Sequence, residues 1–468
     1  DKAEVNQEAT QAANDKVERV KDEWRRWIWT DDARREELAR LYNDVFNTDV
    51  IRTFDGAHLQ LPGKVSDDIV ELRPHQKSFV WRALQTSTAL ADHVVGAGKT
   101  FAAIAAVMEK RRVGQWRKPL MVVPNNLVGQ WAADFVKLYP GAKILATTKA
   151  DFEADARKKF FVRVATGDWD AIIVSHSSFG RIGVDPEFEA AFIREQMDDL
   201  EDSMAKLRQQ SGKDSRNAKQ LAKWRENLET KLKKLLDAGR KDDGLTFNEI
   251  GIDGLIVDEA HEFKNLSFAT SLTRVAGLGN PQGSQKAADL YMKIRAVKER
   301  TGGKNVMFLT GTPISNTMAE MYTMQRYLDE EALRAMSVAH FDAWARVFGE
   351  VVSDWELSPS GQYKLNSRFA KFVNMPELMQ RYRSFADVIT NDDIRAQLAA
   401  QGKTLPIPRV KGGKPTIVVV ERSEAQAQFI GVGRPGANGD DVYPEGSLIW
   451  RAEHLPKKAE KGADNMLK

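Results

Sequence analysis

The sequence predicts an α/β protein with a mostly parallel sheet, and three observations lead to this fold class. From about Leu72, short apolar runs alternate with helical patterns, which is typical of βαβ units. Two of these runs end directly in polar clusters, one at Asp258 and Glu259 and the other at Thr310. A Gly-Ala-Gly-Lys-Thr segment that ends at Thr100 stands before a helical pattern, as in a phosphate-binding loop.

Composition indicates a globular chain with more than one structural unit. The 468 residues exceed what one core usually serves, and 42% of them are hydrophobic while 29% are charged. Cysteine is absent, which excludes disulfides and thiolate metal sites and is compatible with a reducing cytoplasm. No apolar run approaches the roughly 18 residues that cross a bilayer, so we expect no membrane partner. There is no signal-peptide pattern, and the missing initiator methionine suggests a processed protein or a piece of a longer one.

Net charge gives no strongly basic footprint of the kind that nucleic-acid-binding proteins often carry. The 69 basic and 66 acidic residues leave a charge of +3 at pH 7. Any nucleic-acid site must therefore come from the local placement of charge.

Residues 1–70 predict a helical N-terminal extension. Apolar residues recur there at helical spacing, namely Val17, Val20, Trp24, Trp27 and Ile28. We expect an amphipathic helix that docks on the next domain. The alternative is that its tryptophans, which lie among arginines, stack on bases.

Residues 71–330 predict the main domain, in which helical patterns separate the strands and so imply a parallel sheet. The expected strands are Leu120–Val123, Ile144–Ala146, Ala171–Val174, Gly254–Val257 and Val306–Leu309. Residues 331–404 predict a helical extension. Residues 405–468 predict a linker, extended at Leu405–Pro408, and the start of an incomplete second domain with a strand at Thr416–Val420.

An insertion at 191–243 interrupts the alternation of strands and helices. Two apolar seams with coiled-coil spacing predict a helical hairpin, and they comprise Ile193, Met197, Leu200, Met204 and Leu207, then Leu221, Trp224, Leu228, Leu232 and Leu235. Residues 193–204 carry one base and five acids, whereas residues 219–241 carry eight bases and three acids. Opposite charge favours pairing of the two arms, and the alternative for the basic arm is contact with a phosphate backbone.

The Gly-Ala-Gly-Lys-Thr segment matches the second half of the phosphate-binding loop (P-loop) pattern. Gly96 and Gly98 would let backbone amides approach phosphates at a helix N-terminus. Lys99 would neutralise the β- and γ-phosphates, and Thr100 would offer its hydroxyl to Mg²⁺. His93 stands where the full pattern has its first glycine, and a Gly-Lys-Thr helix start also occurs by chance.

Asp258 and Glu259 stand at the expected carboxyl end of a buried strand, where open α/β sheets bind ligands. A surface turn with two ordinary acids is the alternative when the pair is considered alone. Together with a phosphate-binding loop, the pair predicts ATP hydrolysis. Asp258 would hold Mg²⁺, and Glu259 would orient and deprotonate the attacking water.

Further polar clusters follow the same logic. Gln76 could read the adenine edge or simply begin a helix. Asn125 and Gln130 lie in a segment after an expected strand, and Ser175 follows another strand. Such groups suit phosphate contacts, and helix capping is the alternative.

These motifs in this order resemble the first RecA-like domain of a superfamily-two, Swi/Snf-type DNA-dependent ATPase. The resemblance covers about residues 71–420 and includes a Leu-Arg-Pro-x-Gln segment from Leu72 to Gln76. It also includes the P-loop without its first glycine, and an Asp-Glu-Ala-His (DEAH) box that is followed by Lys264 and Asn265. A Thr-Gly-Thr-Pro cluster from Thr310 completes the set.

The resemblance implies a role for each matching residue. Catalysis is implied for Lys99, Asp258 and Glu259. Binding of ATP and Mg²⁺ is implied for Gln76, Gly96, Gly98, Lys99, Thr100 and Asp258. Coupling of hydrolysis to movement is implied for His261, Thr310, Gly311 and Thr312. Contact with DNA, or support of that surface, is implied for Asn125, Gln130, Ser175 and Lys264.

The family also places arginine fingers on a second RecA-like domain, for which we find no candidate before Lys468. An arginine finger can be worth roughly 10³–10⁵ in rate, so the resemblance implies weak ATP binding and poor hydrolysis by the chain as given.

The N-terminal region resembles the large methyltransferase–helicase fusions of phages and plasmids. The matching segments are Trp27–Trp29, Leu41–Asn43, Phe46–Asn47 and Asp55–Leu59. Some members are phage anti-restriction proteins, injected with the DNA or packaged with the capsid. This resemblance implies a methyltransferase domain in the parent protein and a cytoplasmic location, or association with the virion, although these 468 residues contain no methyltransferase signature.

The leading hypothesis is an ATP-driven motor that tracks along double-stranded DNA. One alternative is a strand-separating helicase or the motor subunit of a restriction–modification enzyme. Another is a scaffolding module that keeps the ATPase fold without turnover.

Overall fold

The computed structural model describes the chain as two compact units. Its described residues are 7–46, 51–148, 151, 154–211, 216–238, 245–272, 275–357, 363–400, 402–403, 418, 420, 423–431, 434–435 and 441–453. The larger unit takes Ala12–Val351 and Phe369–Thr404, and the smaller takes Asp1–Gln11, Val352–Arg368 and Leu405–Lys468. Every residue to which we assign a functional role belongs to the larger unit.

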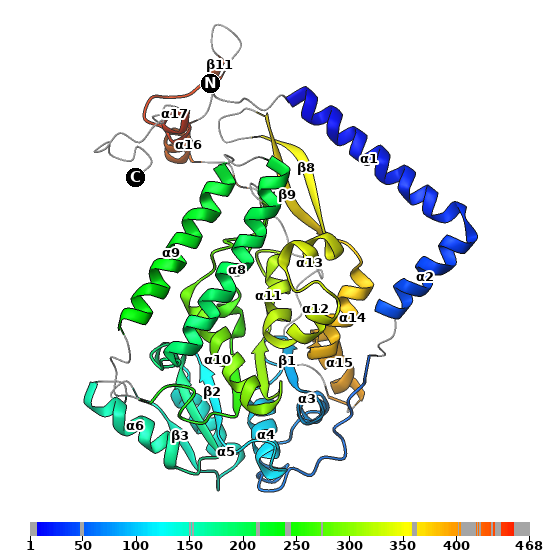
Figure 1. Ribbon diagram of the computed structural model, residues 1–468. Helices are drawn as coiled ribbons and strands as arrows, with labels where there is room; N and C mark the ends of the chain where they lie inside the picture. Colours follow the sequence, from blue (N-terminus) through cyan, green and yellow to red (C-terminus); the bar gives the residue numbers. More distant parts are fainter. Residues whose placement is uncertain are drawn as a thin grey trace. The chain divides into compact units, whose positions relative to one another are not determined.

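A seven-stranded parallel sheet forms the centre of the larger unit, which confirms the predicted fold class (Figure 1). The strand order is β10-β1-β7-β5-β2-β4-β3. The strands are β1 Thr88–His93, β2 Pro119–Val123, β3 Ile144–Ala146, β4 Ala171–Ser175, β5 Gly254–Asp258, β7 Val306–Thr310 and β10 Ala386–Ile389. All neighbours pair in parallel, so every carboxyl end lies at one edge of the sheet.

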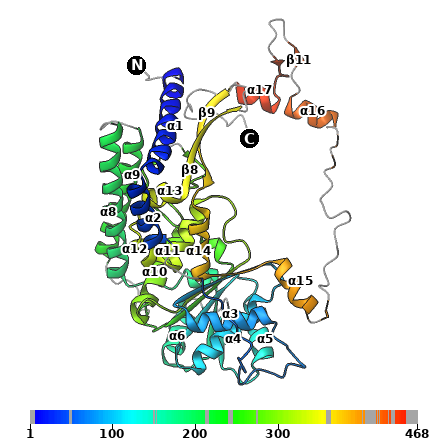
Figure 2. The same cartoon turned by 90° about the vertical axis from the view of Figure 1, so that its right-hand side faces the viewer.

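Helices cover both faces of this sheet (Figure 2). One face packs against α3 Pro74–Gln85, α4 Lys99–Arg112 and α5 Val128–Leu138. The other face packs against α10 Gln285–Thr301, α11 Ala319–Leu328 and α13 Phe341–Phe348. Alternate residues of one strand serve the two cores: Met307 and Leu309 belong to the first, whereas Val306 and Phe308 belong to the second. This burial on both faces explains why the strands have continuous apolar sequences.

The five predicted strands are all present, but β1 and β10 were not predicted. β1 has the sequence Thr-Ala-Leu-Ala-Asp-His, in which small and polar residues hide the apolar pattern. It is buried because β10 and β7 pair with it on either side. β10 has only four residues and includes Asp387, so its sequence carries little strand signal.

The predicted hairpin is present as two long helices that pack side by side (Figures 1 and 2). α8 covers Pro186–Ser211 and α9 covers Arg216–Ala238. Their contact buries Leu200, Met204, Leu221 and Trp224 together with Ala269 of the main body. Complementary charge supports the pairing, because Arg225 Nε lies 2.7 Å from Glu201 Oε1 and Lys231 Nζ lies 2.8 Å from Glu189 Oε1.

The prediction of a helical extension at 331–404 is wrong for its middle part. The helices α12 Glu330–Ala335, α13, α14 Met375–Phe385 and α15 Asn391–Ala400 are present. Between them, however, β8 Gly349–Leu357 and β9 Tyr363–Phe372 form a sheet of order β6-β9-β8 with β6 Val275–Ala276. Only the end of β8, Asp-Trp-Glu-Leu, alternates polar and apolar residues at the period of a strand, so the local signal is short.

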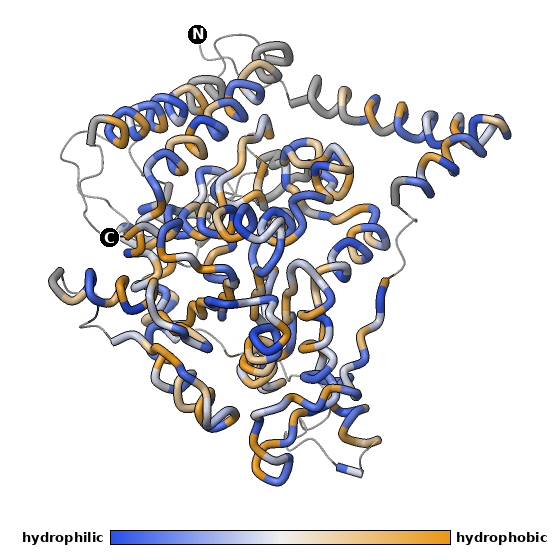
Figure 3. The backbone as a smooth tube through the Cα atoms, turned by 60° about the horizontal axis from the view of Figure 1, so that its bottom comes forward, coloured by the Kyte–Doolittle hydropathy of each residue, from blue (hydrophilic) through white to orange (hydrophobic). Residues whose placement is uncertain are grey.

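The N-terminal extension is helical as predicted, with α1 Gln7–Thr30 and α2 Asp32–Phe46. Hydrophilic and hydrophobic residues are interspersed along the helices drawn in Figure 3. Trp24, Trp27 and Trp29 remain 56%, 46% and 64% exposed. The contacts of Trp27 come from the N-terminal helices themselves. The ring of Trp24 stacks on it with 4.9 Å between the ring centroids, and the Arg34 guanidinium lies 3.5 Å from its ring centroid. The described residues therefore do not provide the core against which we expected these rings to dock.

The remaining elements complete the described part of the chain. They are α6 Ala154–Thr166, α7 His176–Phe179, the 3₁₀ helix η2 Ala260–Phe263, α16 Glu424–Ile430, β11 Arg434–Pro435, β12 Asp441–Val442 and α17 Leu448–Glu453. The predicted linker at Leu405–Pro408 lies outside the described residues, as does most of the predicted strand at Thr416–Val420. Among the helices that the structure describes, none combines the length and apolar character needed to cross a membrane.

Candidate functional site

Three neighbouring strands end in the polar segments that the sequence singled out. β1 leads into the P-loop, β7 leads into the Thr-Gly-Thr-Pro cluster, and β5 leads into the acid pair. Because β7 lies between β1 and β5 and all three are parallel, these segments meet at one edge of the sheet. The structure thus brings together residues that are as far apart in sequence as Lys99 and Thr310.

The P-loop has the backbone of an anion cradle. Gly96 and Gly98 both have φ of 84°, a conformation that L side chains rarely adopt. A Cβ atom on Gly98 would lie 2.3 Å from Gln76 Nε2, so a side chain at this position would displace the Gln76 amide. Lys99 opens α4, and its ammonium donates to the carbonyl of His93 over 2.9 Å, which folds the lysine back across the loop.

Gln76 and His75 support this loop from α3. The Gln76 amide donates from Nε2 to the Gly98 carbonyl over 2.8 Å, and its Oε1 accepts from the Arg73 amide over 2.7 Å. His75 Nε2 lies 2.8 Å from the Ala97 carbonyl, and its other nitrogen lies 2.8 Å from Gln397 Oε1. Each polar atom of Gln76 makes one hydrogen bond in this structure, so the predicted adenine contact would use the remaining N–H and the remaining lone pair of the amide.

Asp258 is a buried carboxylate at the end of β5, with 7% of its surface exposed. Its side chain accepts a hydrogen bond from Trp131 Nε1 over 3.2 Å. Burial and the adjacent charge of Glu259 raise the pKa of Asp258 from 3.8 to about 6, and attraction to Lys99 opposes this change. The attraction to Lys99 therefore does not fully offset the negative charge of Asp258 and Glu259, and a divalent cation would supply the missing positive charge.

Glu259, the predicted base, has a left-handed backbone with φ of 50° and ψ of 47°. Such a conformation is strained for a residue other than glycine and is common at functional sites. The carboxylate is 38% exposed, and its Oε2 lies 3.1 Å from His261 Nδ1. The same nitrogen lies 3.0 Å from the hydroxyl of buried Thr310, so a short chain of polar contacts joins the base to the end of β7.

The Thr-Gly-Thr-Pro cluster closes the site between the other two segments. The Thr310 hydroxyl also accepts a hydrogen bond from the Thr312 amide over 3.2 Å. At Gly311, an added Cβ would lie 3.0 Å from the His93 carbonyl and 3.6 Å from Lys99 Nζ. Gly311 therefore permits a close approach to the P-loop, and only a small residue fits there.

Lys264 is held by the loop that follows β7. Its ammonium lies 3.2 Å from Glu320 Oε1 and also donates to Ser315 Oγ. Glu320 is 2% exposed, and it accepts from the amides of Ser315 over 2.7 Å and Asn316 over 3.2 Å. In this structure, then, Lys264 supports the surface rather than projecting freely from it.

The other residues with an implied DNA role differ in exposure. Asn125 and Gln130 are exposed near the carboxyl end of β2, and Asn125 Oδ1 accepts from the Ser177 amide over 3.0 Å. Ser175 is buried and caps α7, since its hydroxyl accepts from the Ser178 amide over 3.1 Å. The capping alternative therefore describes Ser175. A cavity of about 640 Å³ lies between these segments, lined by Asn125, Asn126, Ser177, Arg181, Gln285 and Lys286 among others.

Several residues that shape the site were given no role in it from the sequence. Trp131 donates to Asp258, and His176 Nε2 lies 2.9 Å from the backbone carbonyl of Asp258. His93 is fully buried, and its Nε2 lies 2.7 Å from Asp387 Oδ2 on β10. Trp131, His176 and His93 lie in or beside the polar segments at the strand ends. Their position in these segments could have identified them as residues of the site. Asp387 had no such signal, because β10 was not predicted.

The residues present fit a magnesium–nucleotide complex. The described residues contain no cluster of three histidine or acidic side chains that would enclose a metal alone. Mg²⁺ commonly uses one or two carboxylates together with substrate phosphates, and Asp258 with Thr100 offers such a set. The glycine cradle and Lys99 face the same edge, and they suit the phosphates.

Comparison with known proteins agrees with this geometry. The chain belongs to the family described as "Probable helicase domain", whose match covers residues 81–390. Residues 1–48 match a domain of unknown function. The family match confirms the resemblance to helicase-type ATPases that the motifs suggested.

The chain is similar to the Defense against restriction protein B of Escherichia phage P1, with 24% identity over 420 residues. The match takes 80% of this chain but only 18% of the length of that curated relative. Among solved structures, the SWI2/SNF2 ATPase core of Sulfolobus solfataricus in complex with double-stranded DNA is 16% identical, with 62% of this chain and 40% of that chain covered and a TM-score of 0.35. The SWI2/SNF2 ATPase core domain from the same organism is 16% identical, with 73% and 50% covered and a TM-score of 0.36.

Proposed function

We propose that this chain is the first motor domain of an ATP-dependent double-stranded DNA translocase. The observation that carries the proposal is the meeting of the P-loop, the acid pair and the Thr-Gly-Thr-Pro cluster at three neighbouring strand ends. A scaffold without turnover would have no need for a buried, uncompensated Asp258 beside a strained Glu259. The family match to a helicase domain supports the same conclusion.

The proposed chemistry assigns one task to each side chain. Lys99 would leave the His93 carbonyl and neutralise the β- and γ-phosphates of ATP, and Thr100 and Asp258 would hold Mg²⁺. The metal ion, when bound, offsets the charge that develops on the phosphate oxygens. Glu259 orients a water molecule towards the γ-phosphate and accepts its proton.

Coupling to movement would run through the contacts between strand ends. Glu259 contacts His261, and His261 contacts Thr310, so a change at the base reaches the end of β7. The loop beyond β7 is tied to Lys264 through Glu320. A separate route leads towards the surface that carries Asn125 and Gln130, where we place DNA, because His176 contacts the Asp258 carbonyl and the adjoining Ser177 amide donates to Asn125. Ser175 supports this surface as a helix cap.

The larger setting of this motor follows from its relatives. We propose that it works with a second RecA-like domain, which completes the site with arginine fingers, and that it belongs to an anti-restriction system of a phage or a related mobile element. We propose a methyltransferase domain as a further part of the parent protein. The similarity to a phage defence protein supports this setting, and it suggests action in the host cytoplasm or from the virion.

ATP hydrolysis and triplex displacement by the complete gene product test the proposal. Lys99→Ala should weaken ATP binding about 10- to 150-fold, since a hydrogen bond to a charged group contributes about 1.5–3 kcal/mol. Glu259→Gln should keep ATP binding but lower kcat by on the order of 10²–10⁴. Glu299→Gln, an exposed acid on α10, is the matched control and should change neither. Triplex displacement that persists in Glu259→Gln would refute the mechanism.

A further inference from the structure

A second polar cavity lies at the edge of the sheet opposite to the P-loop. Its volume is about 710 Å³. Residues that directly precede four parallel strands line it, namely Ser87 before β1, Lys118 before β2, Asp253 before β5 and Asn305 before β7. The cavity is therefore separated from the proposed ATP site by the length of the strands, and no role proposed above uses it.

The lining is strongly basic. Five of its side chains are cations, namely Lys110, Arg117, Lys118, Arg300 and Lys304. Asp253 is the one carboxylate in the lining. Its two oxygens accept hydrogen bonds from the backbone amides of Arg117 over 2.8 Å and Lys118 over 2.7 Å. The carboxylate is thus occupied by neutral donors, although its charge still acts on Lys118.

Three of the cations are held in place by neutral acceptors. Lys110 Nζ donates to Gln115 Oε1 over 2.9 Å, and Lys118 Nζ donates to the Ala165 carbonyl over 2.7 Å. Arg300 donates to the Ile252 carbonyl over 2.6 Å. Among the described residues, none of the five cations has a carboxylate within ion-pair distance. This arrangement is unusual for Lys110, which is only 3% exposed, because buried charges are normally paired.

The electrostatic consequence is visible at Lys110. Burial and the nearby charge of Lys304 lower the pKa of Lys110 to about 8. Repulsion from Arg300 also lowers the pKa of Lys118, although burial is the larger cause and Asp253 opposes it. An anion in the cavity would relieve this repulsion.

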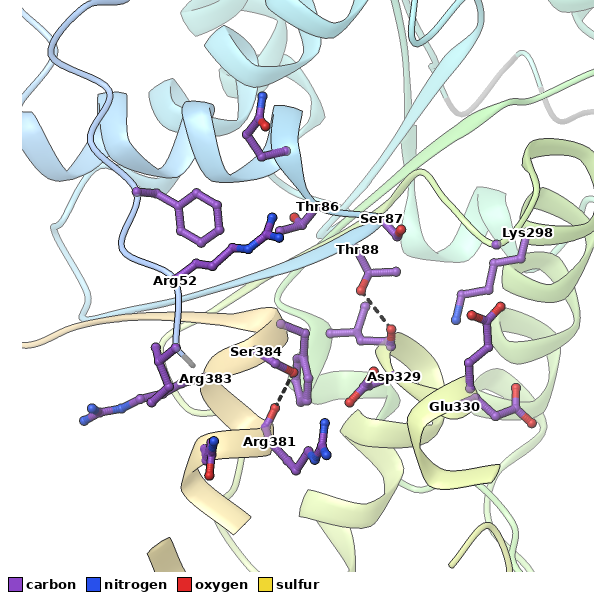
Figure 4. Close-up of a pocket in the computed structure, with 18 residues that line it drawn as sticks. Arg52, Thr86, Ser87, Thr88, Lys298, Asp329, Glu330, Arg381, Arg383 and Ser384 are labelled. Carbon is purple, nitrogen blue, oxygen red and sulfur yellow. Dashed lines mark hydrogen bonds between the residues drawn. The ribbon is translucent and has the colours of Figure 1, made fainter. Parts of the chain in front are cut away.

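A neighbouring cavity shows what a balanced lining looks like (Figure 4). It has a volume of about 450 Å³ and shares Gln85, Thr86 and Ser87 with the basic cavity. It too carries basic residues, which include Arg52 and Lys298, but it also carries Asp329, Glu330 and Glu331. Glu330 is already paired with Arg334 over 2.8 Å and with the Tyr291 hydroxyl over 2.7 Å. The cavity before β2 and β5 therefore has the larger excess of positive charge of the two, with five cations against one carboxylate, compared with four against three.

We propose that this basic cavity binds a small phosphate-bearing anion with at least two negative charges. Ammonium and guanidinium groups are the side chains that recognise phosphate oxygens, and Lys110 and Lys118 each retain at least one ammonium hydrogen beyond those given to their neutral acceptors. The volume lies in the range of small-molecule sites, whereas a nucleic acid backbone would need a groove that runs along the surface. The phosphate could belong to free pyrophosphate or to a free nucleotide.

Calorimetric titration with pyrophosphate and with AMP tests the site in the full chain carrying Lys99→Ala, which removes the P-loop lysine. We expect pyrophosphate to bind at a single site. Adding Arg117→Glu and Lys304→Glu, two exposed positions, should weaken binding at least about 10-fold, which corresponds to loss of one charge-assisted hydrogen bond. AMP binding with the same sensitivity would identify the source as a nucleotide.

The matched control carries the same change of charge outside the cavity. Lys233→Glu with Lys234→Glu on α9 should leave pyrophosphate binding unchanged. Circular dichroism verifies that each variant is folded. If the variant with both charge reversals does not fold, Lys304→Ala is used in its place. Absence of binding, or an equal loss in the control, would overturn the proposal. So would a short DNA duplex that binds more tightly than pyrophosphate and shows the same sensitivity, because the cavity would then be a DNA contact.

Discussion

Replacing Asp258 by asparagine is expected to stabilise the protein at neutral pH while it removes the proposed Mg²⁺ ligand. The folded-state pKa of Asp258 is about 6, above its ordinary value of 3.8. Ionisation is therefore less favourable in the folded state than in the unfolded state. The stability of the wild-type protein falls as the pH rises between these two values, and the loss is complete above about pH 6.

The magnitude follows from the difference between the two pKa values. The difference between a folded-state pKa of about 6 and the ordinary value of 3.8 corresponds to about 3 kcal/mol at pH 7.5 and to about 2 kcal/mol at pH 5. The asparagine side chain is always neutral and its oxygen can still accept from Trp131, so Asp258→Asn should recover up to these amounts. Such a gain in stability at the expense of activity is a known trade-off at functional sites.

Urea denaturation at pH 5.0 and pH 7.5, followed by far-ultraviolet circular dichroism, measures the effect. The stabilisation by Asp258→Asn should be larger at pH 7.5 by about 1 kcal/mol or more. Asp68→Asn, which changes an exposed carboxyl, is the control and should stay within about 0.5 kcal/mol of the wild type at both values. Equal effects of Asp258→Asn at the two pH values, or destabilisation at pH 7.5, would contradict the prediction, because the folded protein would then stabilise the charge of Asp258.

Two further predictions concern the P-loop and its support. Gly98→Ala should destabilise the protein and weaken ATP binding measured by calorimetry, because the new Cβ would lie 2.3 Å from Gln76 Nε2. Gly114→Ala, also at positive φ but in open space, should show only the backbone cost of about 1–2 kcal/mol, and an equal effect of the two would contradict this. Asp387→Ala should cost about 1–3 kcal/mol in urea denaturation, because it leaves fully buried His93 without its partner, whereas exposed Asp392→Ala should cost under about 0.5 kcal/mol. A cost for Asp387→Ala no larger than that control would mean that β10 does not support the P-loop.

The sequence carried enough information for the centre of the fold. β2, β4, β5 and β7 are buried on both faces, so they read as uninterrupted apolar runs, and their positions were predicted to within one residue. The hairpin was predicted because two helices that pack on each other repeat apolar residues at a regular spacing. In both cases, the burial that stabilises an element also leaves a periodic mark in its sequence.

Elements whose burial depends on distant segments left a weaker mark. β1 carries small and polar residues that become buried only because β10, almost 300 residues further along the chain, pairs with it. The β8–β9 pair was missed because the segments before and after it are helical, and because its alternation of polar and apolar residues is short. Local patterns report local structure, whereas strand pairing over long sequence distances does not follow from them.

For the candidate site, the sequence by itself determined which residues carry the chemistry: the glycines and Lys99 of the P-loop, the acid pair, and the cluster at Thr310. Each lies in a short segment whose residue types are dictated by a backbone conformation or a charge. The tertiary structure decided how they are held. It placed Gln76 against Gly98, buried Asp258 beside Trp131, and joined Glu259 to Thr310 through His261. It also gathered unpaired cations at the opposite edge of the sheet, because parallel strands bring their amino ends together regardless of where those ends lie in the sequence.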